Sequence, residues 1–233
     1  MEWRKGLEAP GSGEVHVWRA TTLVPPQGFD ERWAVLDSTE RARADRFRVS
    51  RDRERFVAAR AFLRALLSCY TGVPPAAIRF SVLAHGKPAL AEPGGPHFNL
   101  SHSHEAAVCA VAGREVGIDI EQVRPLPDAM QIAARFFSAE ERDALAIVPP
   151  ERRDRAFFAC WTRKEAYVKA TGSGLLVPLD RFSVTVEPGD AVLLRGAGTA
   201  AWSIRDIDAG AGYAGAVAVE MPDPDVRERA WEF

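Results

Sequence analysis

"RAFFACWTRKEAYVKATG", residues 155–172, has the apolar spacing of a half-buried helix that ends at a glycine. An earlier stretch, "RFVAARAFLRALLSCYTG" at residues 55–72, reads in the same way and also ends in Thr-Gly. Each stretch is followed by a proline and then by the tetrapeptide Arg-Phe-Ser-Val, at 79–82 and at 181–184. The matching order predicts an internal duplication of roughly a hundred residues.

Strand-like runs separated by Gly, Pro and polar turns surround the two helices. A shorter helix should open at Asp37 or Ser38, which are good N-cap residues. We therefore expect an α+β fold, a pseudo-dimer of two similar lobes that each pack a long helix on a small, mostly antiparallel sheet. The lobes should span residues 1–122 and 123–233, with the active site between them, and the duplication favours a monomer. The expected strands are 15–20, 78–83, 97–103, 106–113, 115–121 and 213–220.

The composition is that of an ordinary soluble protein, with 233 residues, 47% of them hydrophobic and 27% charged. The sequence has no apolar run long enough to cross a membrane and no secretion signal at its start, which favours a cytoplasmic protein without a membrane partner. Three widely spaced cysteines in apolar surroundings indicate reduced core thiols.

The positive charges are unevenly distributed, because ten arginines and only five acidic residues lie between Arg32 and Arg64. One interpretation is a solvated, partly salt-bridged helix surface. The other is a site for a phosphate-rich ligand or an acidic protein, since the guanidinium group matches phosphate oxygens. The whole chain is not basic and has no nucleic-acid-binding motif, so nucleic acid is not the expected partner.

Three carboxylates are the candidate metal ligands. In "EVGIDIE", residues 115–121, the strand period of two places Asp119 and Glu121 on one face and isoleucines on the other. This face is either a solvated acidic edge or a site for a hard divalent cation such as Mg²⁺. Glu165, at the edge of the buried stripe of its helix, could supply a third oxygen ligand, and Lys169 could hold phosphate. The alternative for these two residues is an ordinary surface ion pair.

Two histidines stand in "FNLSHSHEAAV", residues 98–108. His102 and His104 could bind zinc, but no third nitrogen or sulfur ligand lies at a recognisable spacing. Ser101 beside His102 could suggest a hydrolase, but the sequence around the serine is not that of a nucleophile elbow. A histidine that donates to a phosphate fits the cationic neighbourhood better.

Four blocks in this order resemble the long, two-lobed Sfp-type branch of the 4′-phosphopantetheinyl transferase superfamily. They are "HGKPAL", "FNLSHS", "VGIDIE" and "FFACWTRKEAYVKATGSGL", and they span residues 85–175. The resemblance implies the fold of that family and transfer of the 4′-phosphopantetheine arm of coenzyme A to a serine of an acidic, helical acyl or peptidyl carrier protein. The products would be the holo-carrier and 3′,5′-ADP.

The resemblance also implies roles for individual residues. Glu165 is the candidate base, directly or through a water, and Lys169 contacts the pyrophosphate of the substrate. A helical segment at 124–145 that contains Arg135, Phe136 and Phe137 is expected to dock the carrier; the alternative is that both phenylalanines are core residues. The implied Mg²⁺ or Mn²⁺ ligands are Asp119, Glu121 and Glu165, and the implied coenzyme A contacts are Arg43, Arg51, Lys87, Ser101, His102 and Lys169.

Two other functions use the same residues. A metal-dependent phosphodiesterase or nucleotidyl transferase would hydrolyse coenzyme A without a carrier, and a regulatory protein would bind coenzyme A without chemistry. The last residues, "PDPDVRERAWEF" at 222–233, are expected to form a loosely packed tail.

Overall fold

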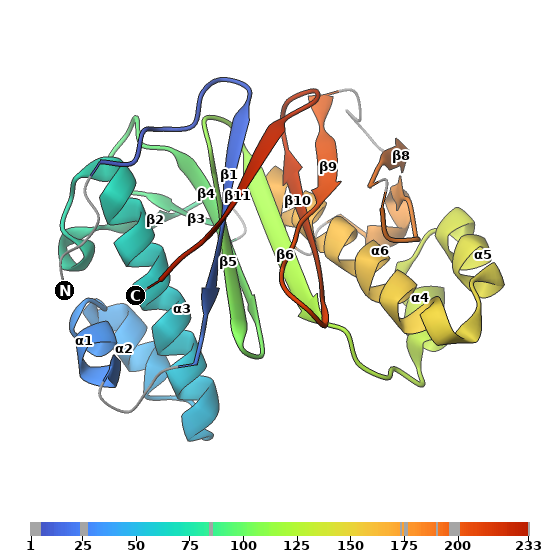
Figure 1. Ribbon diagram of the computed structural model, residues 1–233, viewed down its shortest axis with the longest axis horizontal. Coiled ribbons are helices and arrows are strands. Elements are labelled where there is room, and N and C mark those ends of the chain that lie inside the picture. Colours follow the sequence, from blue (N-terminus) through green and yellow to red (C-terminus); the bar gives the residue numbers. More distant parts are fainter. Residues whose placement is uncertain are drawn as a thin grey trace.

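The strands form two main sheets that lie side by side across the middle of the molecule (Figure 1). The computed structural model describes residues 6–23, 28–83, 86–172, 174, 177–189, 191–195 and 201–232. The first sheet has the order β11-β1-β5-β4, in which β11 is parallel to β1 and the other neighbours are antiparallel. Its strands are β1 (Glu14–Thr21), β4 (His97–Ser103), β5 (Ala106–Ala112) and β11 (Asp225–Ala230).

The second sheet is antiparallel, with the order β6-β10-β9. Its strands are β6 (Val116–Gln122), β9 (Ser203–Asp206) and β10 (Tyr213–Val219). The expected division of the chain near residue 122 stays a prediction. The hydrogen bonds pair β6 with β10 and β11 with β1, so the two sheets do not coincide with the two halves of the sequence.

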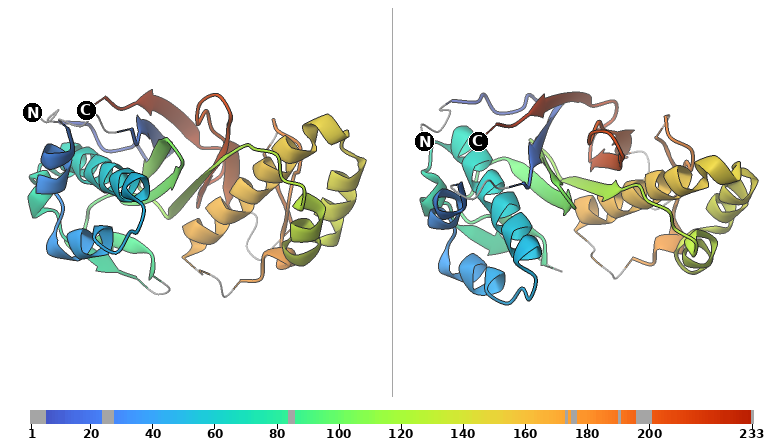
Figure 2. Two further views of the ribbon diagram at one scale, coloured as in Figure 1. Left: turned by 90° about the horizontal axis from the view of Figure 1, so that it is seen from below. Right: turned by 60° about the horizontal axis from the view of Figure 1, so that its bottom comes forward.

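Each sheet carries one long helix, and Figure 2 shows these helices on either side of the strands. Helix α3 (Ser50–Thr71) packs with the first sheet in a core that contains Trp18, Phe62 and Phe98. Helix α6 (Pro150–Thr171) packs on the second sheet. Both helices have 22 residues, and both are followed by a glycine in the left-handed conformation that commonly ends helices.

The shorter elements repeat in the same order around the two long helices. In the first half they are α1 (Phe29–Ala34), α2 (Ser38–Ala44), the 3-10 helix η2 (Pro75–Ala77), β2 (Phe80–Val82) and β3 (Pro88–Leu90). In the second half they are α4 (Ala129–Phe136), α5 (Ala139–Ile147), η5 (Leu179–Arg181), β7 (Ser183–Val184) and β8 (Leu193–Arg195). The predicted α+β fold of two similar lobes is confirmed.

The two lobes share a buried ion pair at matching positions. Helices α2 and α5 each begin with a capping box, in which Glu40 and Glu141 are the third helical residues. The Nε atom of Arg64 lies 2.6 Å from Oε2 of Glu40, and the Nζ atom of Lys164 lies 2.6 Å from Oε1 of Glu141. The side chains of Arg64 and Lys164, one on each long helix, are fully buried. The duplication therefore extends to this charged contact.

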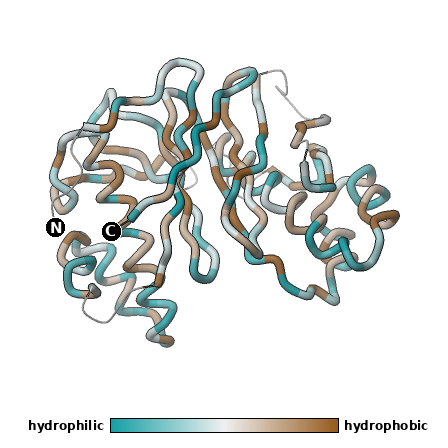
Figure 3. The backbone as a smooth tube through the Cα atoms, in the orientation of Figure 1, coloured by the Kyte–Doolittle hydropathy of each residue, from teal (hydrophilic) through white to brown (hydrophobic). Residues whose placement is uncertain are grey.

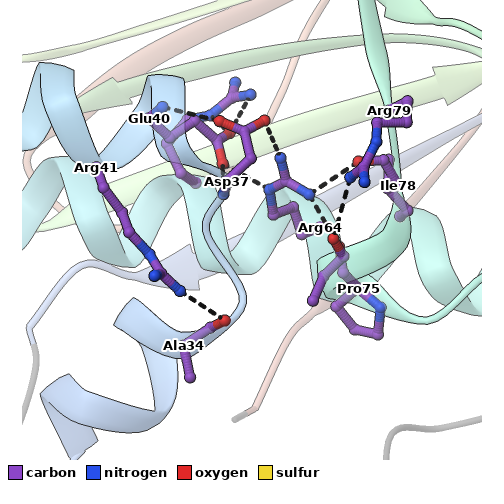
Figure 4. A network of polar contacts seen from close by, with 10 residues as sticks. Ala34, Asp37, Glu40, Arg41, Arg64, Pro75, Ile78 and Arg79 are labelled. Atoms are coloured by element: carbon purple, nitrogen blue, oxygen red, sulfur yellow. Dashed lines mark hydrogen bonds and ion pairs between the residues drawn. The ribbon is translucent and has the colours of Figure 1, made fainter.

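The same two cations also fix the turn that follows each long helix. Arg64 donates to the carbonyl oxygens of Pro75 and Ile78, as Figure 4 shows. Lys164 donates to the carbonyl oxygen of Phe182 at 2.8 Å. Burial lowers the pKa of Lys164, while the charge of Glu141 opposes that shift. In each lobe one buried cation thus joins a short helix, the long helix and the first residues of a small hairpin.

The expectation of a loose C-terminal tail is wrong. Residues 225–230 form β11, and Trp231 is buried in the first core, where its ring meets Trp18 edge to face at 5.9 Å. Strand β11 is hydrophilic, drawn mostly in teal in Figure 3, because it lies at the edge of the sheet with most side chains exposed. Its pattern "DVRERA" therefore lacks the apolar alternation that marks a half-buried strand.

The three cysteines, Cys69, Cys109 and Cys160, are buried thiols as predicted. Burial raises the pKa of Cys109 and of Cys160 above the ordinary value of 9.0, which suits core residues. Within the described part of the chain, no helix has the length and apolar character needed to span a membrane.

We predict that Lys164→Met destabilises the protein by about 3–5 kcal/mol, because it leaves the Glu141 carboxylate buried without its cation. The double variant Glu141→Gln/Lys164→Met should recover part of this loss, because the amide carries no buried charge and its oxygen can still accept from one of the two backbone N–H groups, Ser138 or Val184. Urea unfolding followed by circular dichroism measures both changes. Equal instability of the single and double variants would contradict this explanation.

Candidate active site

A row of side-chain hydrogen bonds joins the two sheets. Strands β4 and β6 run in the same direction, and alternate polar side chains of β4 accept hydrogen bonds from alternate backbone N–H groups of β6. The pairs are Asn99 Oδ1 with Ile118 N at 2.9 Å, Ser101 Oγ with Ile120 N at 3.4 Å, and Ser103 Oγ with Gln122 N at 3.2 Å. We call these three contacts the β4–β6 ladder. It satisfies backbone groups along the edge of β6 that would otherwise be buried without partners.

The ladder also holds the two acidic side chains of β6. Ser101 Oγ donates to Asp119 Oδ1, and Ser103 Oγ donates to Glu121 Oε2, both at 2.9 Å. Ile118 and Ile120 are buried on the opposite face, as the strand period predicted. Only 5% of the surface of Asp119 is exposed, so the interpretation of a solvated acidic edge is wrong for this residue.

Helix α6 brings a lysine to Asp119. The helix packs so closely on β6 that a Cβ atom at Gly117 would lie 2.2 Å from the carbonyl oxygen of Ala166 and from the backbone nitrogen of Ala170. Because α6 lies so close to β6, the Nζ atom of Lys169 comes within 2.6 Å of Asp119 Oδ1. The helix is therefore a wall of the site, and Lys169 is more than the partner of a neighbouring glutamate on an exposed helix face.

The three candidate metal ligands share one electrostatic environment. Burial raises the pKa of Glu121, and the charge of Asp119 raises it further. Burial also raises the pKa of Glu165, followed by the charge of Asp119, while Lys169 opposes the shift. The carboxylates of β6 and α6 therefore repel one another in a partly desolvated space.

The donor chemistry fits a hard divalent cation. Asp119 Oδ2 is buried and has no hydrogen-bond partner among the described residues. Mg²⁺ commonly binds one or two carboxylates together with water and substrate phosphate oxygens. Over the ranges that the structure describes, no three His, Cys, Asp or Glu side chains already lie close enough to hold a metal ion. Asp119 and Glu121 are thus the better supported pair, and the assignment of Glu165 as third ligand stays a prediction.

A pocket of about 680 Å³ opens beside these residues. Glu165 and Lys169 line it from α6, and Asn99 and Leu100 line it from β4. Its wall is mostly apolar elsewhere, which suits an uncharged, flexible part of a ligand. The site thus combines a charged end at Lys169 with a larger apolar space.

Lys87 lies in the wall of this pocket, but its ammonium group is engaged within the protein. Nζ donates to Glu115 Oε2 at 2.6 Å, to the carbonyl oxygen of Ala170 at 2.9 Å and to that of Val116 at 3.1 Å. Its role as a coenzyme A contact stays a prediction. Of the sequence blocks that suggested these roles, His85, Ser173 and Leu175 lie outside the described residues.

Positive charges surround His102, an exposed residue of β4. Partial desolvation by the surrounding protein lowers the pKa of His102. The positive charges of Lys169, Arg43, Arg55 and Arg60 lower it further. A neutral imidazole within a cationic surface can donate to a phosphate oxygen without adding repulsion between cations.

The structure divides the arginine-rich segment between the two interpretations. Arg60 and Arg64 bind Glu40, so they belong to the framework of the first lobe. Arg43 is exposed, with its guanidinium group 5.2 Å from the centre of the Phe56 ring, and Arg51 forms an exposed ion pair with Glu105 at 2.9 Å. Arg43 and Arg51 are thus accessible to a ligand, and their contact with a phosphate stays a prediction.

The segment expected to dock a carrier is only partly a surface. Phe137 is 2% exposed and stacks on Phe157, so its assignment to a docking surface is wrong. Phe136 is half-buried and lines the pocket, and the exposed Arg135 lies over its ring. Adjacent phenylalanines at the end of α4 point to different sides, which the sequence alone did not distinguish.

Several residues that build the site were missed by the sequence analysis. Asn99 and Ser103 belong to the ladder, Gly117 permits the close packing of α6, and Glu115 holds Lys87. Polar residues at every second position of "FNLSHS" were the available signal. Because they accept from the backbone of another sheet, their partners could not be read from spacing within β4.

Two family models match the chain. The model of the 4′-phosphopantetheinyl transferase superfamily matches residues 115–218, and that of the 4′-phosphopantetheinyl transferase N-terminal region matches residues 18–116. The chain is 40% identical over 200 residues to the 4′-phosphopantetheinyl transferase HetI of Nostoc sp., which covers 84% of this chain and 83% of HetI. It is 32% identical over 199 residues to the 4′-phosphopantetheinyl transferase Sfp of Bacillus subtilis, covering 84% and 88%.

Among solved structures, the chain is similar to the holo-[acyl-carrier-protein] synthase of Thermotoga maritima. The TM-score is 0.37 at 22% sequence identity, and the match covers 46% of this chain and 64% of that chain.

We predict that Gly117→Ala destabilises the protein by about 1–3 kcal/mol or more, because the added methyl group meets the backbone of α6. Gly113→Ala is the matched control, since a Cβ atom there has no neighbour within 4 Å. Thermal and urea unfolding of both variants give the comparison. Equal stability of the two variants would contradict the close packing of α6 on β6 at Gly117.

We also predict that Glu165→Gln stabilises the metal-free protein at pH 7. The folded-state pKa of Glu165 is raised above its ordinary value of 4.5, so the unfolded chain ionises first and stability falls as the pH rises through this range. Glutamine avoids that loss, and its advantage should vanish below about pH 4. Urea unfolding in EDTA at both pH values measures the difference, with the exposed Glu54→Gln as control. An advantage of the same size at both pH values would contradict the electrostatic cause.

Proposed function

The chain belongs to the 4′-phosphopantetheinyl transferase superfamily, and from that premise we propose that it transfers phosphopantetheine from coenzyme A to a serine of an acyl or peptidyl carrier protein. The enzyme class follows from the relatives at 32–40% identity. The substrate, the acceptor residue and the metal are the proposal. The best support is the environment of the Asp119 carboxylate. Its Oδ1 atom pairs with Lys169, and its Oδ2 atom is buried without a hydrogen-bond partner among the described residues.

The reaction is a phosphoryl transfer. The serine oxygen attacks the β-phosphorus of coenzyme A, the bond from that phosphorus to the bridging oxygen breaks, and 3′,5′-ADP leaves with the electron pair. Negative charge grows on the leaving phosphate, so a fixed cation beside it stabilises the transition state more than the ground state. Lys169 can supply this charge because its side chain is 30% exposed and lines the pocket, while Asp119 and Ser101 hold its ammonium group in place.

Asp119, Glu121 and Glu165 are the residues that would hold Mg²⁺ or Mn²⁺. When bound, such an ion supplies positive charge to the pyrophosphate oxygens and relieves the repulsion among the three carboxylates. Asp119 has a buried oxygen available for this role, and Ser101 and Ser103 orient the two carboxylates of β6.

Glu165 is our candidate for the base that takes the serine proton, directly or through a water. Its carboxylate lines the pocket, and burial raises its pKa, which makes it a stronger base than an exposed glutamate. A metal ion beside it would lower that pKa again. The two roles proposed for Glu165 therefore compete.

Coenzyme A would lie across the two lobes. The accessible Arg43 and Arg51 suit its 3′-phosphate, and His102 is exposed to the charges of both Arg43 and Lys169, which lower its pKa. The apolar part of the pocket, beside Leu100 and Phe136, suits the pantetheine arm. Ser101 acts in this arrangement through Asp119 and Lys169, because its hydroxyl group is engaged with both.

The carrier would approach from the second lobe. Arg135 and Phe136 lie at the pocket, where a cation and an apolar side chain suit an acidic amphipathic helix. A smaller hollow of about 170 Å³ lies on the same lobe, where Glu121, Arg124 and Trp161 contribute to its lining. A carrier docked over this hollow would bring its serine toward the acidic residues of β6. We further propose a cytoplasmic monomer, since the two lobes together provide one site.

The first experiment is intact-mass spectrometry of apo-carrier proteins incubated with the protein, coenzyme A and Mg²⁺, with EDTA as control. We expect a metal-dependent gain of one phosphopantetheine on the carrier. Loss of coenzyme A without carrier modification would instead indicate a phosphodiesterase. Binding of coenzyme A with neither reaction, across several carriers, would indicate a regulatory protein.

Asp119→Ala is predicted to reduce transfer by at least about a hundredfold, because it removes the buried metal ligand and the partner of Lys169. Its fold should persist, since the substitution also relieves the repulsion from the neighbouring carboxylates. The rate of carrier modification and a circular dichroism spectrum test both points, with Asp143→Ala as a control at an exposed aspartate. Full activity of Asp119→Ala at saturating Mg²⁺ would show that the metal assignment is wrong.

A further inference from the structure

Lys87 occupies a junction between the two lobes. It stands directly before β3 of the first lobe, and its ammonium group reaches the first residue of β6 and the last turn of α6. Its three donated hydrogen bonds use all three protons of the group. The side chain is 8% exposed, so its charge is compensated inside the protein.

The contact with α6 lies next to the catalytic region. Ala170 directly follows Lys169, and its carbonyl oxygen belongs to the last turn of the helix, where such oxygens have no partner within the helix. A cation at this end also interacts favourably with the helix dipole. The hydrogen bond from Lys87 therefore holds the turn that carries Lys169.

The contact with β6 completes a closed arrangement. Val116 accepts from Lys87, and the next residue is Gly117, which packs against the backbone of Ala166 and Ala170. One ammonium group thus ties the beginning of β6 and the end of α6 where the two elements meet. The ion pair between Lys169 and Asp119 forms close by, one residue before Ala170 on α6 and three residues after Val116 on β6.

Glu115 holds Lys87 in this position. One carboxylate oxygen accepts from Lys87 at 2.6 Å, and the other lies 3.2 Å from Nδ1 of His97. The Glu115 carboxylate, directly before β6, can therefore orient the ammonium group of Lys87 toward the two carbonyl oxygens.

We propose that Lys87 is a positioning residue, held by Glu115, which fixes the last turn of α6 against β6 and so sets where Lys169 meets Asp119. The side chain of Lys87 acts through Lys169 and does not bind a phosphate of coenzyme A. The catalytic part of this inference rests on the proposed function, whereas the fixing of the helix end does not.

The test compares Lys87→Met, Lys87→Arg and Glu115→Gln, with Glu92→Gln as the control at an exposed glutamate that lines a hollow with Glu115. Amide hydrogen exchange of a peptide that covers the end of α6 reports the position of the helix without reference to catalysis. Calorimetry gives the dissociation constant of coenzyme A, and carrier modification gives kcat and KM.

We expect Lys87→Met and Glu115→Gln to speed exchange at the end of α6 and to lower kcat by about tenfold or more, because small misplacements of catalytic groups are costly. The dissociation constant of coenzyme A should change by less than about threefold, since no phosphate contact is lost. Lys87→Arg should recover part of kcat, and Glu92→Gln should match the unchanged protein.

A large loss of coenzyme A affinity in Lys87→Met, with unchanged exchange and an unaffected Glu115→Gln, would overturn the proposal. If Lys87→Met does not fold, Glu115→Gln and Lys87→Arg decide by the same measurements. If the unchanged protein modifies no carrier, the proposed function fails, and faster exchange in the variants still supports the fixing of α6 by Lys87.

Discussion

The β4–β6 ladder is the constraint on which the site depends. Strand β6 has backbone hydrogen bonds to β10 on one edge and donates backbone hydrogen bonds to side chains of β4 on the other, and the backbone of α6 packs against one face at Gly117. These three contacts leave the strand little freedom to shift its register. A shift of one residue would exchange the acidic face with the face of Ile118 and Ile120. The positions of Asp119 and Glu121 are therefore fixed by groups that need not touch a substrate.

The ladder also explains how two small sheets enclose a polar site. A continuous backbone pairing between β4 and β6 would have left no role for the hydroxyl groups of Ser101 and Ser103. Because side chains span the gap, each serine accepts from the backbone of β6 and also donates to an acid on that strand. The same atoms thus join the lobes and orient the carboxylates.

The duplicated framework has diverged at the positions that carry chemistry. Helices α3 and α6 correspond at an offset of 100 residues, and the buried cations Arg64 and Lys164 keep the same role in both. At the same offset, Glu165 and Lys169 correspond to Ala65 and Cys69, which are buried in the first core. The face of α3 that carries Ala65 and Cys69 packs in the first core, whereas the equivalent face of α6, with Glu165 and Lys169, borders the pocket. Charge is tolerated there because Lys169 is paired and partly exposed.

The sequence by itself determined the two long helices, most strands, the alternation in β6 and the family, because periodicity, end residues and ordered motifs are local properties. Only the tertiary structure decided that β11 completes the first sheet, that Phe137 is core, and that Asp119 is buried against Lys169. It also placed Lys87 on Glu115 and the end of α6. These features depend on which segments meet across the lobes, and residues such as Asp119 and Lys169, fifty positions apart, have no local pattern that records their distance.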